Sequence, residues 1–169
     1  MSRRILVAGI GNIFFGDDGF GVEVVRHLHA GPALPPDVEV VDVGIRGIHL
    51  VYELLDGCEL LILVDLAPRG ETPGTVSVIE TSQLPTDRGI PVLDAHGLAP
   101  HELLEAVSGL GASPGRTLIV ACEPADVNPG IGLSPAVAAA VPEAVRLVNE
   151  LVAGGAGVPG LEQALAEKE

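Results

Sequence analysis

Short aliphatic runs that alternate with segments of helical periodicity are the feature that most restricts how this chain can fold. The runs Arg4–Ala8, Glu59–Leu66 and Thr117–Ala121 are largely apolar, which is typical of strands buried on both faces of a parallel sheet. Between such runs, segments such as Gly19–His29 place apolar residues three and four positions apart, as a helix with one buried face does. The alternation predicts an α/β domain in which helices cover both faces of a mostly parallel sheet.

The remaining predicted elements follow the same pattern. Strands are expected at Arg4–Ala8, Val38–Val43, Glu59–Leu66, Thr75–Ile79 and Thr117–Ala121, and helices at Gly19–His29, Ile48–Leu55, about His101–Leu110 and Pro135–Val152. The strand at 75–79 is short and alternates apolar with polar residues, which favours an edge position. The sequence therefore predicts a single domain without internal repeats over residues 1–153 and a flexible C-terminal tail over residues 154–169.

The composition excludes several classes of partner. The formal net charge of −14 over 169 residues argues against binding to nucleic acid or to anionic lipid, and a basic segment of a partner protein would be attracted at long range. The most apolar segment, Leu60–Leu66, is far too short to span a bilayer. Two cysteines cannot supply a disulfide scaffold for a chain of this size. We expect a cytoplasmic monomer.

The loop after the first strand is rich in glycine and carries two adjacent carboxylates. A strand followed by Gly9 and Gly11 suggests dinucleotide binding, but the third glycine of that fingerprint would fall at position 14, which is phenylalanine. The fingerprint is therefore broken. Asp17 and Asp18 precede a predicted helix, where one aspartate is expected to cap the helix. The other aspartate is then available for a different role.

Asp65 and His96 are the other candidate site residues. Asp65 ends the central strand, where a carboxylate is costly unless it is solvated, paired or bound to a metal, although it could instead cap a turn. His96 lies in a loop without helical or strand periodicity. Ligands of open α/β sheets bind outside the carboxyl ends of the strands, so we expect Asp18, Asp65 and His96 to meet there. Two carboxylates and an imidazole suit zinc or nickel.

Cys122 offers a second interpretation of the same sheet edge. It follows the last predicted strand, so a hydrolase that uses Cys122, His96 and Asp65 is conceivable. A cysteine at the end of a buried strand is more often a small apolar core residue, and we prefer that interpretation. Cys58 precedes its strand, which places it at the opposite edge.

Several separated motifs, taken in order, resemble the maturation endopeptidases of nickel–iron hydrogenases. The motifs are Gly9-Ile10-Gly11-Asn12 with Gly16-Asp17-Asp18-Gly19-Phe20-Gly21, Leu63-Val64-Asp65 with Pro73-Gly74-Thr75, His96-Gly97-Leu98 with Glu102-Leu103-Leu104, and Glu123-Pro124 with Gly130-Ile131-Gly132-Leu133-Ser134. The resemblance covers about residues 4 to 152. It implies a three-layer α/β/α sandwich around a five-stranded, mostly parallel sheet, in which Thr75–Ile79 is the antiparallel strand.

The resemblance also implies a reaction. Family members remove a C-terminal extension from the hydrogenase large-subunit precursor after nickel insertion, and the nickel carried by the precursor is the recognition signal. The family's metal-contacting and catalytic positions match Asp18, Asp65 and His96. Either the metal activates the scissile carbonyl or a water, or Asp18 or Asp65 is the general base and the metal positions the substrate. A non-catalytic nickel chaperone is the alternative of a different class, but the chain has no His-rich or Cys-rich tract.

Overall fold

The computed structural model describes residues 3–80, 100–112 and 114–154. The elements in chain order are β1 (Ile5–Ile10), the 3-10 helix η1 (Gly16–Gly19), α1 (Phe20–Ala30), β2 (Val38–Gly44), α2 (Gly47–Leu55), β3 (Cys58–Leu66), β4 (Val76–Glu80), α3 (Pro100–Gly109), β5 (Pro114–Cys122) and α4 (Pro135–Gly154). Within these residues, no helix is both long and apolar enough to cross a membrane. The tail from residue 155 and most of the predicted loop at 89–100 lie outside the described residues.

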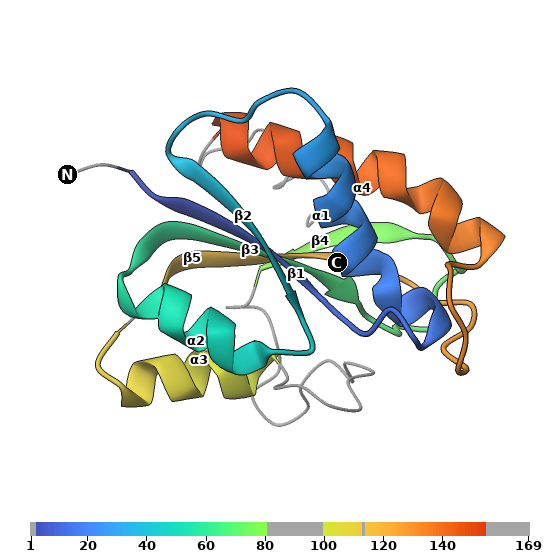
Figure 1. The fold of residues 1–169 in the computed structure, drawn as a ribbon, viewed down its shortest axis with the longest axis horizontal. Coiled ribbons are helices and arrows are strands. Elements are labelled where there is room, and N and C mark those ends of the chain that lie inside the picture. Colours follow the sequence, from blue (N-terminus) through green and yellow to red (C-terminus); the bar gives the residue numbers. More distant parts are fainter. Residues whose placement is uncertain (1–2, 81–99, 113, 155–169) are drawn as a thin grey trace.

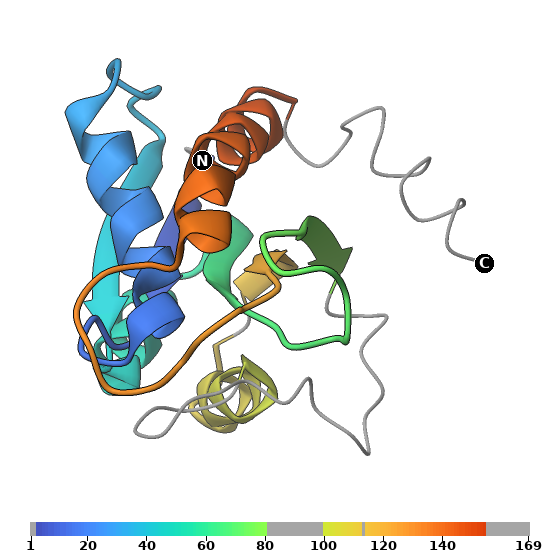
Figure 2. The same cartoon turned by 90° about the vertical axis from the view of Figure 1, so that its right-hand side faces the viewer.

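The five strands form one sheet in the order β2-β1-β3-β5-β4. β1 pairs in parallel with β2 and with β3, and β3 pairs in parallel with β5. β4 is antiparallel to β5 and lies at one edge of the sheet. Helices α1 and α4 cover one face and α2 and α3 the other (Figures 1 and 2). The predicted fold class is confirmed, as is the antiparallel edge strand.

Strand alternation divides the core into two clusters. Ile5 and Val7 of β1 pack under α1 and α4, whereas Leu6 and Ala8 pack under α2 and α3. All four side chains are fully buried, and burying a large aliphatic side chain contributes about 1.5–3 kcal/mol. The strand must therefore be apolar at every position, which explains the continuous aliphatic run in the sequence.

After β1 and after β3, the chain continues toward opposite edges of the sheet. After β1 it passes through α1 to β2, and after β3 it continues to β4 and then to β5 on the other side. The carboxyl ends of β1 and β3 therefore form the topological switch point, the place where open α/β sheets usually bind ligands.

Glycine is required where α1 begins above this switch point. A Cβ atom at Gly21 would collide with the backbone carbonyl oxygens of Val64 and Ile10, and one at Gly9 would collide with the carbonyl of Gly21. These glycines let the first turn of α1 lie directly against the ends of β1 and β3. The glycine-rich loop thus serves close packing of the helix on the sheet.

Two local features differ from the sequence prediction. β5 begins three residues earlier than expected, because Pro114 and Arg116 pair with Cys58 and Leu60 of β3. The 3-10 helix η1 was not predicted; it inserts a tight turn before α1 and contains both aspartates of the first loop.

Candidate functional site

Asp18 is fixed in η1 by the loop that leads into it. Its side chain is buried, and its Oδ2 accepts a hydrogen bond of 2.8 Å from the backbone N–H of Asn12. Gly11 has a φ of +139° and lies so close that a Cβ atom there would collide with the carbonyl oxygen of Asp18. The first loop therefore folds back onto Asp18 and holds its carboxylate in place.

Asp65 lies beside this loop at the carboxyl end of β3. Val64 pairs with Gly9 of β1, so Asp65 follows the last paired position of the two strands. Its side chain is buried, and its Oδ1 accepts a hydrogen bond of 2.7 Å from the backbone N–H of Leu66. Because η1 contacts β3, Asp18 and Asp65 both lie at the carboxyl ends of the parallel strands, at the switch point.

His96, the third predicted site residue, lies outside the described residues. In the part of the chain that the structure describes, no three His, Cys, Asp or Glu side chains form a group that could hold a metal ion. A site of Asp18, Asp65 and His96 needs the histidine, so this three-residue set stays a prediction.

Asp17 does not cap its own helix, contrary to one interpretation of the Asp17–Asp18 pair. Neither η1 nor α1 has a side-chain cap. The Asp17 side chain is fully buried and accepts four hydrogen bonds, from the backbone N–H groups of Ala125, Asp126 and Ser134 and from the Ser134 hydroxyl, at 2.7–3.0 Å. Burial alone raises the pKa of Asp17, but these hydrogen bonds outweigh burial and lower the pKa below its usual value.

The four bonds join the first loop to the loop before α4. Backbone bonds from Gly16 to Gly130 and from Gly130 to Phe14 continue the connection. The hydroxyl of Ser134, which precedes α4, also accepts a long bond of 3.4 Å from the Val137 N–H, as a helix N-cap does. Asp17 thus anchors the first loop directly beside Asp18. The sequence did not indicate this role.

Glu123 is a further buried acid at this edge. It follows β5, is 8% exposed, and its Oε2 accepts a 2.7 Å hydrogen bond from the backbone N–H of Arg69. Its own backbone bonds to Gly74 and Thr75. Glu123 therefore holds the loop between β3 and β4, directly after Asp65. Glu123 belongs to the Glu123-Pro124 motif of the sequence. The only sequence feature that pointed to its role in holding this loop was its position after a buried strand.

Cys122 is unsuited to be a nucleophile. Its side chain is fully buried. Burial, and then the negative charges of Asp17 and Glu123, raise the pKa of the Cys122 thiol to about 12. Because the thiolate is the reactive form, the preferred interpretation of Cys122 as a core residue agrees with its surroundings. Cys58 begins β3, so it lies at the amino end of that strand, away from Asp65.

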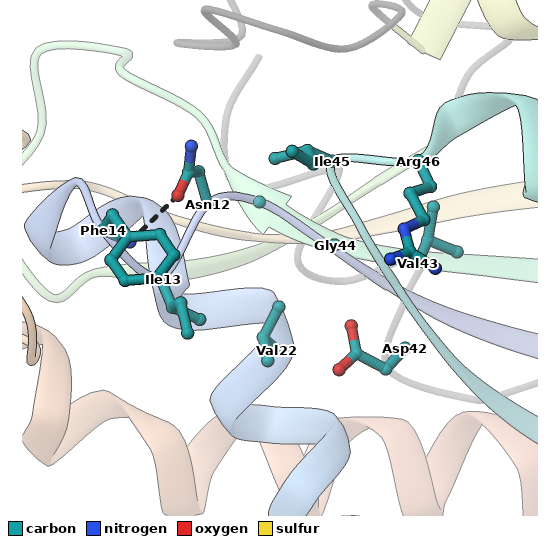
Figure 3. Close-up of a pocket in the computed structure, with 10 residues that line it drawn as sticks. Asn12, Ile13, Phe14, Val22, Asp42, Val43, Gly44, Ile45 and Arg46 are labelled. Atoms are coloured by element: carbon teal, nitrogen blue, oxygen red, sulfur yellow. Dashed lines mark hydrogen bonds between the residues drawn. The ribbon is translucent and has the colours of Figure 1, made fainter.

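A pocket of about 410 Å³ opens next to Asp18, between the loop after β1 and the loop after β2 (Figure 3). Sequence reasoning did not identify it. Asn12, whose N–H binds the Asp18 carboxylate, is one of its lining residues. The edge thus combines buried carboxylates with a cavity large enough for a peptide side chain, a combination that suits a hydrolytic site.

Comparison with known sequences gives one consistent result. A sequence model described as hydrogenase maturation protease matches residues 22–151, a range that includes Asp65 and His96 and begins after Asp18. The hydrogenase expression/formation protein HupD of Bradyrhizobium diazoefficiens is 32% identical over 169 residues, covering 99% of this chain and 88% of the relative. The hydrogenase 2 maturation protease of Escherichia coli is 31% identical over 150 residues, covering 86% of this chain and 88% of the relative.

A solved structure agrees in fold. The hydrogenase maturating endopeptidase HybD from Escherichia coli superposes with a TM-score of 0.74 at 30% identity, and the match covers 90% of this chain and 94% of HybD. The similarity in sequence and in structure therefore extends over nearly all of the described residues.

Proposed function

Because this chain belongs to the hydrogenase maturation protease family, we propose that it removes the C-terminal extension of a nickel–iron hydrogenase large-subunit precursor after nickel insertion. The observation that carries the proposal is the placement of two buried carboxylates, Asp18 and Asp65, at the switch point of the sheet. A pocket that suits a side chain of a peptide substrate is lined by Asn12, whose backbone N–H donates to the Asp18 carboxylate.

We assign recognition of the nickel carried by the precursor to Asp18, Asp65 and His96. Carboxylate oxygens and an imidazole nitrogen form a donor set that suits nickel. The two buried carboxylates, in a chain of net charge −14, create a negative potential that attracts a cation. In this proposal nickel is part of the substrate, and the precursor supplies its remaining ligands.

The residues of this chain then position the peptide and move a proton. Nickel carried by the precursor would supply a Lewis acid for the reaction. Asp18 and Asp65 hold the ion, so the peptide segment next to it is kept in one orientation. We assign the general base that accepts a proton from the attacking water to one of these two carboxylates.

We propose that this reaction takes place in a reducing compartment. Cys58 and Cys122 are both free thiols and begin and end different strands, so they form no disulfide with each other. Free thiols are usual in cytosolic proteins, which agrees with the expected cytoplasmic location.

Processing of the nickel-loaded precursor tests the proposal. The wild-type protein should release a C-terminal fragment, seen as a loss of precursor mass. The variants Asp18→Asn, Asp65→Asn and His96→Ala should process at least about 100-fold more slowly, because loss of a positioned acid or base typically costs that much. Asp56→Asn, an exposed site after α2, is the matched control and should process normally. A precursor of unchanged mass after incubation with wild-type protein would contradict the proposal.

A further inference from the structure

Helix α2 carries apolar side chains on two of its sides. Its inner side, formed by Leu50, Val51 and Leu54, is buried in the core. Ile48 and Tyr52 lie on another side of the helix and are 55% and 65% exposed. A helix on the surface of a globular domain normally has one apolar face, directed at the core, and a polar face toward water. Packing within the domain therefore does not account for the second apolar side of α2.

The exposed side chains form a continuous stripe along the helix. Ile45, just before α2, and Leu55, at its end, are also exposed, by 46% and 40%. Together with Ile48 and Tyr52 they follow one another at intervals of three, four and three residues. This spacing is that of the contact positions through which two helices pack along a common seam. Figure 1 shows α2 on the outside of the sheet. We call these four residues the α2 seam.

The two ends of α2 carry opposite charges. Arg46 precedes the first turn and Asp56 follows the last, and both are exposed. The ion pairs of the described residues involve neither of them. When two copies of α2 pack antiparallel, Arg46 of each copy lies opposite Asp56 of the other. A parallel pair would place like charges side by side, so the charges favour the antiparallel pair.

We infer that the α2 seam joins two copies of this chain into an antiparallel dimer. Ile48 packs against Leu55 of the second copy, and Tyr52 lies near the two-fold axis. At each end of the seam, Arg46 pairs with Asp56 of the second copy. A two-fold interface uses the same surface on both subunits, and the α2 seam is complementary to itself in this sense. The inference does not depend on the proposed function, and it replaces the monomer expected from the sequence.

The dimer should be weak. One short helix seam offers roughly a few hundred Å² of apolar surface, less than the roughly 800 Å² per partner of a standard interface. The net charge of −14 on each chain also repels a second copy. We therefore expect a Kd on the order of 100 µM at physiological salt. The chain is then monomeric in dilute processing and unfolding assays, in which Asp56→Asn stays a neutral control.

Sedimentation equilibrium, at loading concentrations from well below to well above this Kd, tests the dimer. Ile48→Glu and Leu55→Glu should each raise Kd at least about tenfold, because they place an uncompensated charge in the apolar seam. Ile131→Glu is the matched control, since Ile131 is 81% exposed in the loop before α4; it should keep the wild-type Kd. A wild-type chain that stays monomeric, or an Ile48→Glu chain that dimerises like wild type, would overturn the inference.

Exchange of the end charges tests the antiparallel arrangement. Arg46→Glu and Asp56→Arg should each raise Kd about fivefold, because each places like charges opposite one another at both ends of the seam. The double variant Arg46→Glu/Asp56→Arg restores opposite charges and should return Kd to within about twofold of wild type. Asp56→Arg alone makes the net charge less negative, so a dimer governed by overall repulsion would become stronger. That result, or a double variant as weak as the single variants, would overturn the antiparallel pair.

Tyrosine fluorescence shows whether the contact lies on α2. The chain has one tyrosine, Tyr52, and no tryptophan, so the intrinsic emission comes from the α2 seam. Quenching of this emission by acrylamide should decrease as the wild-type protein dimerises, because the second copy covers Tyr52. It should stay constant over the same concentrations in Ile48→Glu. Dimerisation without protection of Tyr52 would mean that another surface joins the copies, and would overturn the assignment to α2.

Discussion

Asp17 accepts hydrogen bonds from both the backbone N–H and the hydroxyl of Ser134, at 2.7 and 3.0 Å, although the two residues are 117 positions apart. Ser134 directly precedes α4, so the pair connects the first loop of the chain to the start of its last helix. This connection, rather than a helix cap, accounts for the second aspartate of the Asp17–Asp18 pair. It makes Asp17 a structural residue next to a candidate site residue.

Asp17→Asn should therefore destabilise the fold. A hydrogen bond to a charged group contributes about 1.5–3 kcal/mol. In the variant, the asparagine side-chain NH2 group would face backbone N–H groups that donate to the Asp17 carboxylate, and two donors cannot form a hydrogen bond. We expect a loss of about 3 kcal/mol in the free energy of unfolding, measured with urea at neutral pH. Asp56→Asn, at an exposed site, should stay within about 0.5 kcal/mol of wild type. Equal stability of the two variants would contradict the structural role of Asp17.

The stabilisation by Asp17 should also depend on pH in one direction. Its pKa is lowered from the ordinary value of 3.8, so the folded state favours the ionised carboxylate. The stabilisation is complete above the pKa of the unfolded chain and is lost as the pH falls through the lower pKa of the folded protein. The stability difference between wild type and Asp17→Asn should be constant from about pH 7 to pH 5 and shrink below about pH 4. A difference that grows in acid would be inconsistent with a lowered pKa.

Gly21→Ala should be strongly destabilising, because its new Cβ atom would collide with the carbonyl oxygens of Val64 and Ile10. Overpacking of this kind typically costs about 1–3 kcal/mol. Gly109→Ala is the matched control, since its Cβ would meet no atom within 4 Å at the end of α3. It should be neutral or stabilising by up to about 1 kcal/mol. Thermal unfolding measures both; comparable melting temperatures would argue against the close approach of α1 to the sheet.

Cys122→Ala should process the precursor at the wild-type rate. With a pKa raised to about 12, only about one Cys122 thiol in 10⁵ is ionised at pH 7, so iodoacetamide should not label it in the native protein. Mass analysis after labelling in the native and in the urea-unfolded state checks this expectation. Rapid native labelling of Cys122, or loss of processing in a Cys122→Ala protein that melts normally, would restore the cysteine-peptidase alternative.

The sequence predicted the elements well because local patterns determine them. For the described residues, the aliphatic runs and the helical spacing predicted the five strands and four α-helices to within a few residues. β2, for example, was expected at Val38–Val43 and is found at Val38–Gly44. Asp65 could be placed at the carboxyl edge for the same reason, since a carboxylate at the end of a buried run has a fixed position on a parallel strand.

Features that depend on distant partners could not be predicted. The donors to Asp17 lie 108–117 residues away, and nothing around Asp17 in the sequence indicates them. The pocket that contains Asn12 is formed by the loops after β1 and β2, which meet only because these strands are neighbours in the sheet. Asp42 and Ile45 line one cavity with Ile13 only because of that pairing.

We propose that nickel in the precursor licenses cleavage at the end of the sheet that carries Asp18 and Asp65. Mass spectrometry of the large-subunit precursor after incubation with this protein measures this dependence, with nickel-loaded and nickel-free precursor treated in parallel. Only the nickel-loaded precursor should lose its C-terminal extension. Equal cleavage of both forms, or cleavage of neither, would contradict it.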